Sequence, residues 1–145
     1  MPAKRIVVAI VAGFVLVGAG RYLIHSVWLA SAYAQDSGLW RTQAAMLHRV
    51  WVVQLAGFLF AAAATLIYVR GIEAKPWFGQ GVRFGILLAF ATAIPQSMVE
   101  YFTYPIPHTM MIQWIIGEGG LALLLGILVS AICRPTAAPA PGRLR

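Results

Sequence analysis

The chain has 145 residues, of which 61% are hydrophobic and only 10% are charged, and its mean hydropathy is +0.80. Soluble domains are nearer half apolar and a quarter charged, so this composition excludes an ordinary soluble protein and indicates an integral membrane protein. The net charge of +7 comes from 11 basic and 4 acidic residues. Because the basic residues mostly flank apolar stretches, their expected partner is the anionic headgroup layer of a lipid bilayer, and no nucleic-acid partner is expected.

Four stretches are long and apolar enough to cross a bilayer, which takes about 20 residues. They are residues 6–30, 46–69, 82–104 and 109–133. Residues 1–133 are therefore expected to form one all-α domain, a four-helix transmembrane bundle. Residues 134–145 are rich in proline and alanine and are expected to be a disordered cytoplasmic tail.

The basic residues predict the orientation of the bundle. Lys4 and Arg5 precede the first span, a basic group flanks the connection between the second and third spans, and Arg134 follows the last span. The first connection holds only Arg41 beside Asp36, and the third holds no lysine or arginine. Because cytoplasmic loops carry the excess of basic residues, both termini are expected to be cytoplasmic.

A cleaved signal peptide is the alternative interpretation of the first span. A signal peptide has a basic start, an apolar run and a cleavage site after small residues. The chain shows this order in Lys4-Arg5, the apolar run that follows and Ala32-Tyr33-Ala34. However, Arg21 interrupts the run, and the cleavage site lies far beyond the first apolar core. A mature chain that starts at Gln35 would overturn the four-span prediction.

Small residues recur at four-residue spacing along the predicted spans. Because lipid supplies no hydrophobic drive for helix association, such stripes favour close contact between helices. The third span has Gly81, Gly85, Ala89 and Ala93, and the fourth has Gly126 within a similar stripe. The contacts are expected within one compact bundle, with a homodimer through the stripe of the third span as the alternative.

The polar residues inside the spans lie almost entirely in the half of each helix that would face the outer leaflet. They are Arg21, His25, His48, Arg49, Gln54, Gln96, Glu100, Gln113 and Glu118. The other halves are almost entirely apolar. This asymmetry predicts a polar pocket that opens toward the outer surface and takes a ligand or a proton.

Charged pairs are expected within this pocket, because a charge at bilayer depth costs several kcal/mol, by roughly 2.5–3.5 on insertion scales. Counting residues along each helix makes Arg21 and Glu118 the deeper pair, and Arg49 and Glu100 the shallower one. Arg49 lies close enough to the surface to extend outward instead. The alternative for Arg21 and Glu118 is a purely structural ion pair.

Motifs for catalysis or metal binding are not found in the sequence. It has no phosphate-binding glycine loop, no zinc-protease helix and no serine elbow. Three histidines, His25, His48 and His108, stand on three different helices, and no two share a helical face. No metal, no cofactor and no catalytic residue is therefore expected, and an intramembrane enzyme is the least supported function.

Part of the chain resembles a group of small bacterial four-span proteins of unknown function. The likeness rests on Tyr68-Val69-Arg70-Gly71, on Gly81-Val82-Arg83-Phe84-Gly85-Ile86-Leu87, on Pro95 and on Tyr104-Pro105-Ile106-Pro107. It covers about half of the chain. The resemblance implies a multi-pass protein of the bacterial inner membrane, and it implies no activity and no catalytic residues.

Three functions compete on this evidence. The first is a ligand-binding or accessory membrane protein with its pocket around Arg21 and Glu118. The second is a small proton-coupled transporter, which the apolar halves of the spans disfavour because a transporter needs access from both sides. The third is a structural subunit of a larger membrane complex, in which the charges are paired for assembly.

Overall fold

The computed structural model describes residues 2–35 and 37–134. Within these residues the chain is helical and contains no strand. The tail expected over residues 134–145 lies outside the described residues except for Arg134. Four helical stretches are long and apolar enough to cross a membrane, which confirms the expected number of spans: Ala3–Trp28, Val50–Arg70, Trp77–Thr103 and His108–Ile132.

The first span is α1 (Ala3–Arg21), which continues into a π-helix, η1 (Tyr22–Trp28). Short elements then cross one end of the bundle: α2 (Ala30–Gln35), the 3₁₀-helix η2 (Ser37–Leu39) and α3 (Gln43–Leu47). The remaining spans are α4 (Val50–Arg70), α5 (Trp77–Ala91) with α6 (Ala93–Thr103), and α7 (His108–Ile132).

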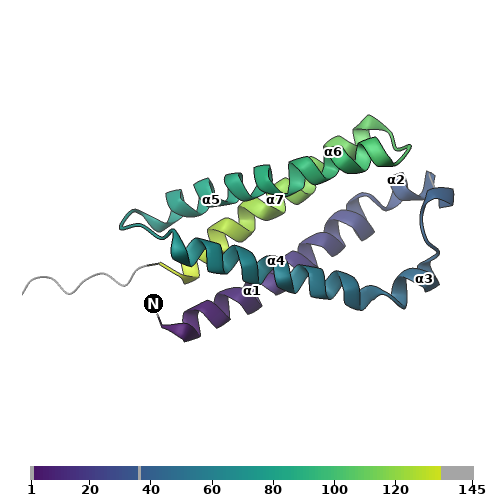
Figure 1. Ribbon diagram of the computed structural model, residues 1–145. Coiled ribbons are helices and arrows are strands. Elements are labelled where there is room, and N and C mark those ends of the chain that lie inside the picture. The colour runs from purple at the N-terminus through teal and green to yellow at the C-terminus, as the bar shows by residue number, and fades with distance from the viewer. Residues whose placement is uncertain (1, 36, 135–145) are drawn as a thin grey trace, which may run out of the picture.

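The chain passes four times along the long axis of the molecule, so that Pro2 and Arg134 lie at the same end (Figure 1). We call this the terminal end and the opposite one the α2–α3 end. A hydrogen bond of 3.0 Å from Arg5 Nη1 to the carbonyl oxygen of Arg134 joins the start of α1 to the end of α7. This placement of the two ends is what an even number of spans requires.

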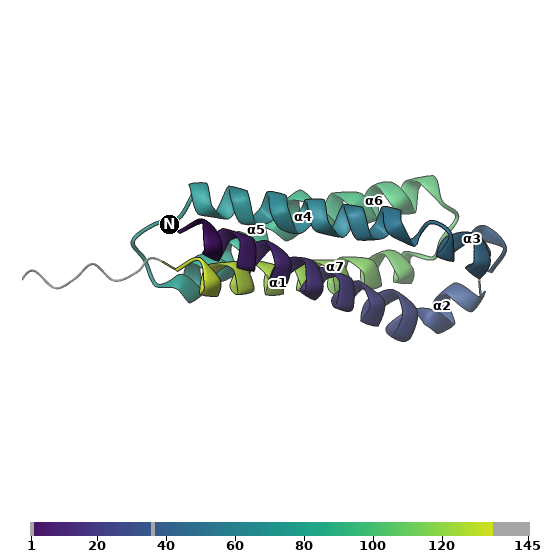
Figure 2. The same cartoon turned by 90° about the horizontal axis from the view of Figure 1, so that it is seen from below.

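Helix α7 is the centre of the bundle. It packs against α5 and α6 on one side and against α1 on another, whereas α4 packs mainly along α1 and touches α7 only lightly (Figures 1 and 2). Val17, Leu125 and Val129 are almost completely buried in the half toward the terminal end. The first apolar stretch is therefore an integral part of the core in this fold.

Glycines bring α5 and α7 into backbone contact. A Cβ atom added to Gly85 would lie 2.6 Å from the Cα atom of Leu123, and one added to Gly126 would lie 2.6 Å from the backbone nitrogen of Gly85. Gly81 and Ala93 are also buried, and Ala89 is half-buried. Since α7 of the same chain occupies the stripe of the third span, a second copy could pack there only by displacing α7.

The third span breaks at Thr92, whose backbone (φ −128°, ψ −69°) departs from the helix. Pro95 is the cause, because it has no N–H to donate to the carbonyl four residues earlier, at Ala91. The Thr92 hydroxyl donates to the carbonyl oxygen of Leu88 at 2.7 Å, which adds a polar bond at the break. Segments α5 and α6 are thus two helices within one span, divided at Thr92.

A buried glutamine organises the turn between α4 and α5 at the terminal end. The Gln80 side chain accepts from the backbone N–H of Glu73 and donates to the carbonyl oxygens of Glu73 and Lys75, at 2.8–2.9 Å. The Glu73 carboxylate pairs with Lys75 and with Arg83. The hydrogen bond from Lys75, followed by the charges of Lys75 and Arg83, lowers the pKa of Glu73. No pattern in the sequence predicts this arrangement.

Replacing Gly85 with alanine is expected to destabilise the protein, because the new methyl group would overlap the backbone of α7. Overpacking of this kind costs about 1–3 kcal/mol. Gly120→Ala is the matched control, since nothing lies within 4 Å of a Cβ atom at Gly120 on the exposed side of α7. Thermal melting in detergent should show a lower midpoint for Gly85→Ala only. Equal midpoints for the two variants would refute the backbone contact.

Candidate functional site

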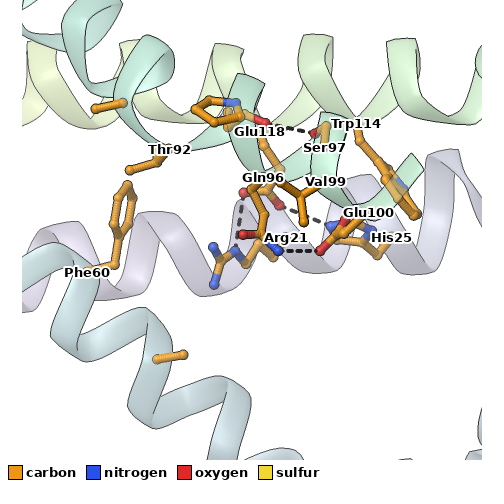
Figure 3. A pocket seen from close by; sticks show the side chains of 14 residues that line it. Arg21, His25, Phe60, Thr92, Gln96, Ser97, Val99, Glu100, Trp114 and Glu118 are labelled. Carbon is orange, nitrogen blue, oxygen red and sulfur yellow. Dashed lines mark hydrogen bonds and ion pairs between the residues drawn. The ribbon is translucent and has the colours of Figure 1, made fainter. Parts of the chain in front are cut away.

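A cavity of about 590 Å³ lies in the half of the bundle toward the α2–α3 end. All four spans contribute to its walls. Arg21 and His25 come from the first span, Ala56 and Phe60 from α4, and Trp114 and Glu118 from α7; the third span adds Ala91, Thr92, Ala93, Pro95, Gln96, Ser97, Val99 and Glu100 (Figure 3).

The Glu118 carboxylate is the polar centre of this cavity. Its Oε2 atom lies 3.3 Å from Arg21 Nε, and its Oε1 atom lies 3.0 Å from His25 Nε2. Its side chain is 21% exposed, against 31% for Arg21, so the pair is shielded from solvent without being fully buried. Each carboxylate oxygen thus has its own donor, and both donors come from the first span, one turn apart (Figure 3).

A chain of hydrogen bonds leads from Glu118 toward the α2–α3 end. His25 Nδ1 lies 2.6 Å from the hydroxyl of Tyr33, and the indole N–H of Trp114 donates to the same hydroxyl at 2.7 Å. Because indole can only donate, the Tyr33 oxygen accepts from Trp114. A carboxylate can only accept, so His25 Nε2 carries a proton toward Glu118, and the tautomer of His25 decides which group donates between its Nδ1 atom and the Tyr33 hydroxyl.

Tyr33 keeps its proton over the whole physiological range. Burial raises the pKa of its hydroxyl to about 12, and the negative charges of Glu100 and Glu118 act in the same direction. Its ring also lies in an aromatic cluster that closes the α2–α3 end, with its centroid 5.2 Å from that of Trp40 and 6.4 Å from that of Trp114. Packing and hydrogen bonding therefore hold the phenol beside His25.

Two charged groups on the cavity wall have unused hydrogen-bonding capacity. The Nη1 and Nη2 atoms of Arg21 bond to no described residue, and its guanidinium carbon lies 6.0 Å from the centroid of the Phe60 ring. Glu100 accepts a hydrogen bond of 2.9 Å from the Gln96 amide, but it forms no ion pair with any residue in the described part of the chain.

The structure brings together five of the nine residues predicted for the pocket: Arg21, His25, Gln96, Glu100 and Glu118. It also forms the pair predicted between Arg21 and Glu118.

The other four predicted residues lie elsewhere. His48 and Arg49 precede the first turn of α4, which begins only at Val50, and Arg49 Nη1 donates to the carbonyl oxygen of Ala45 at 2.9 Å. The expected pair of Arg49 with Glu100 is therefore not formed.

Helical geometry explains the two glutamines that miss the cavity. Gln54 is exposed, and it lies two residues before Ala56, which places it roughly 160° away around α4. Gln113 lies five residues before Glu118, roughly 140° away around α7. Both glutamines lie in the half of the helix where the sequence places them, but neither lines the cavity.

Two residues of the hydrogen-bond chain were missed in the sequence. Trp114 precedes Glu118 by four residues, so helical spacing alone places it on the same face of α7. Tyr33 gave no such signal, because it reaches His25 only through the turn from η1 into α2. The π-helical hydrogen bond from Leu29 N to Ile24 O, at 2.9 Å, is part of that turn. π-Helical segments are rare in proteins, but those that occur often lie at functional sites.

Comparison of the chain with protein-family models, with curated protein sequences and with solved structures gave no match. No three histidine, cysteine, aspartate or glutamate side chains come together as a metal site among the described residues. The chemistry of the site is therefore that of a carboxylate held between a guanidinium and an imidazole at the edge of a cavity.

Removing either Arg21 or Glu118 alone should cost more stability than removing both, because each leaves the other charge uncompensated. We expect Arg21→Gln and Glu118→Gln each to lose about 1–3 kcal/mol, less than for a fully buried pair because both groups are partly exposed. The double variant should recover part of the loss in a double-mutant cycle of unfolding in detergent.

The same cycle on Arg21 and Glu100 is the control, since these residues share the cavity without an ion pair. It should give a coupling near zero. Coupling of Arg21 to Glu100 and none to Glu118 would show that the pair is wrongly assigned.

Proposed function

We propose that the chain is a multi-pass protein of a bacterial inner membrane, with both termini cytoplasmic. The four apolar helices support the membrane location, and basic residues gather at the terminal end of the bundle. These are Lys4, Arg5, Arg70, Lys75, Arg83 and Arg134. The connections at the α2–α3 end contain only two lysine or arginine residues, Arg41 and Arg49. The positive-inside rule then puts the terminal end in the cytoplasm and the cavity in the outer half of the bilayer.

Reporter fusions test this orientation. A reporter that is active only in the periplasm should be active when fused after Gly38 and silent when fused after Ala74, because the two turns lie at opposite ends of the bundle. The complementary cytoplasmic reporter should give the reverse pattern. The same side for both positions would reject the four-span orientation.

Within that orientation, the proposed function is to bind an amphiphilic molecule from the outer leaflet. The cavity lies within the usual range of ligand sites, roughly 300–1,000 Å³. Its polar lining consists of the charged or amide side chains of Arg21, His25, Gln96, Glu100 and Glu118 and the hydroxyl side chains of Thr92 and Ser97. Apolar side chains of α4 and α6 complete its walls, and a mixed lining of this kind suits a molecule with a polar head and an apolar body.

The observation that carries this proposal is the separation of α4 from α6 beside the cavity. Ala56 on α4 and Pro95, Gln96 and Val99 on α6 all line the cavity and are all exposed. Helix α4 instead makes its contacts with α1 and, lightly, with α7. The opening therefore faces sideways, toward the lipid, so an amphiphile could enter without leaving the bilayer.

A proton-coupled transporter is the second candidate, and one observation favours it. The chain Glu118–His25–Tyr33 links the cavity to the α2–α3 end through groups that can exchange protons. The close packing of the half toward the terminal end argues against a transporter. There, Val17, Leu125 and Val129 are almost completely buried, and glycines bring α5 and α7 into contact. Transport would require this packing to open, whereas binding requires no change.

Filling the cavity should abolish retention of a bound amphiphile. Ala56→Trp would place an indole in the cavity, and Ala63→Trp is the matched control, since Ala63 is an exposed alanine on the same helix that does not line the cavity. Mass spectrometry of protein purified in mild detergent should show lipid bound to wild type and Ala63→Trp but not to Ala56→Trp. Equal retention in all three would refute the proposal, and a stoichiometric protein partner would favour the structural-subunit alternative.

A further inference from the structure

We propose that the cavity is specific for a zwitterion, a molecule with an ammonium group and an anionic group as in the headgroup of an ethanolamine phospholipid. This inference rests on the proposed binding function and adds the chemical class of the ligand. It is carried by the two charged groups that the protein leaves incompletely paired on the cavity wall, Arg21 and Glu100.

Arg21 supplies the anion-binding side. Its Nε atom is engaged by Glu118, which fixes the guanidinium plane, while Nη1 and Nη2 have no hydrogen-bond acceptor among the described residues. A guanidinium presents its donors as a planar fork that matches a phosphate or carboxylate with two parallel hydrogen bonds. Phe60 lies beside this group, at 6.0 Å from ring centroid to guanidinium carbon.

Glu100 supplies the cation-binding side. Glu118 is paired with Arg21, whereas the carboxylate of Glu100 forms no ion pair with any described residue. One carboxylate oxygen accepts from Gln96, and the other has no described donor. An ammonium group would provide both the missing positive charge and the missing donor.

The depths of the two groups match the way a phospholipid lies in the outer leaflet. Glu100 lies three residues from the end of α6 at Thr103, which is about 5 Å along the helix. Arg21 lies seven residues from the end of η1 at Trp28, so it lies deeper than Glu100 below the same surface. The ammonium would thus be nearer to water and the phosphate deeper. The acyl chains would leave through the opening between Ala56 on α4 and Val99 on α6.

The test compares soluble short-chain lipids that differ only in the headgroup, added to the purified full-length protein in maltoside detergent. Dihexanoyl phosphatidylethanolamine should bind at least about tenfold more tightly than dihexanoyl phosphatidylglycerol, which lacks the ammonium. Glu100→Gln should abolish this preference, and Glu100→Lys should reverse it. Gln54→Glu, which changes a charge on the same half of the bundle outside the cavity, should leave it unchanged.

Arg21 is tested in the double variant Arg21→Gln with Glu118→Gln, which removes the guanidinium without leaving an unpaired carboxylate. It should weaken both phospholipids by about tenfold or more and leave the binding of dodecylammonium, which has no anionic group, unchanged. An equal loss for dodecylammonium would show a damaged cavity and overturn the assignment of Arg21.

Two further outcomes separate the parts of the proposal. If the two phospholipids bind equally to wild type but Ala56→Trp weakens both, the zwitterion inference fails and the proposed function stands. If Ala56→Trp changes neither, the proposed function itself fails. Glycerophosphoethanolamine has the same charges without acyl chains; binding as tight as that of the lipid would identify a free zwitterion as the ligand, and weaker binding would identify the lipid.

Discussion

A carboxylate placed in the middle of an apolar helix must find donors within the protein, and the structure depends on how Glu118 meets this requirement. Arg21 and His25 each bond one of its oxygens, and both belong to the first span. The pairing fixes the rotation of α7 against α1 and η1 and thereby sets which residues face the cavity. It also leaves a guanidinium held in place with two nitrogens free of described partners, and the proposed anion-binding role of Arg21 rests on this feature.

The two halves of the bundle differ in how closely their helices pack. Toward the terminal end, glycines let α5 and α7 approach until their backbones touch, and large side chains such as Leu125 fill the remaining space. Toward the α2–α3 end, α4 and α6 do not close on each other, and polar groups line the space between them. Close packing supplies stability where there is no hydrophobic drive between helices, and it leaves the other half free to hold a cavity.

Hydropathy alone predicted the four spans, and residue counting along them predicted the pairing of Arg21 with Glu118 and the presence of Gln96 and Glu100 beside it. The side of the helix on which each polar residue lies was harder to predict, because a helix carries polar residues on several sides. Gln54 and Gln113 lie in the predicted half of their helices, but they do not line the cavity. The start of α4 was misplaced because the apolar residues Met46 and Leu47 were counted into the span, although α4 begins at Val50. Tyr33 and Gln80 depend on how turns fold back, which no local pattern encodes.

The break at Thr92 divides the third span between two tasks. Residues of α5 before the break hold the glycine contact with α7, whereas the cavity residues Gln96, Val99 and Glu100 follow it on α6. Substitutions at these three exposed or half-buried cavity residues therefore leave the glycine contact between α5 and α7 intact. Since most substitutions in a tightly packed interface are destabilising, this division leaves the proposed ligand preference as the property that can diverge most readily during evolution.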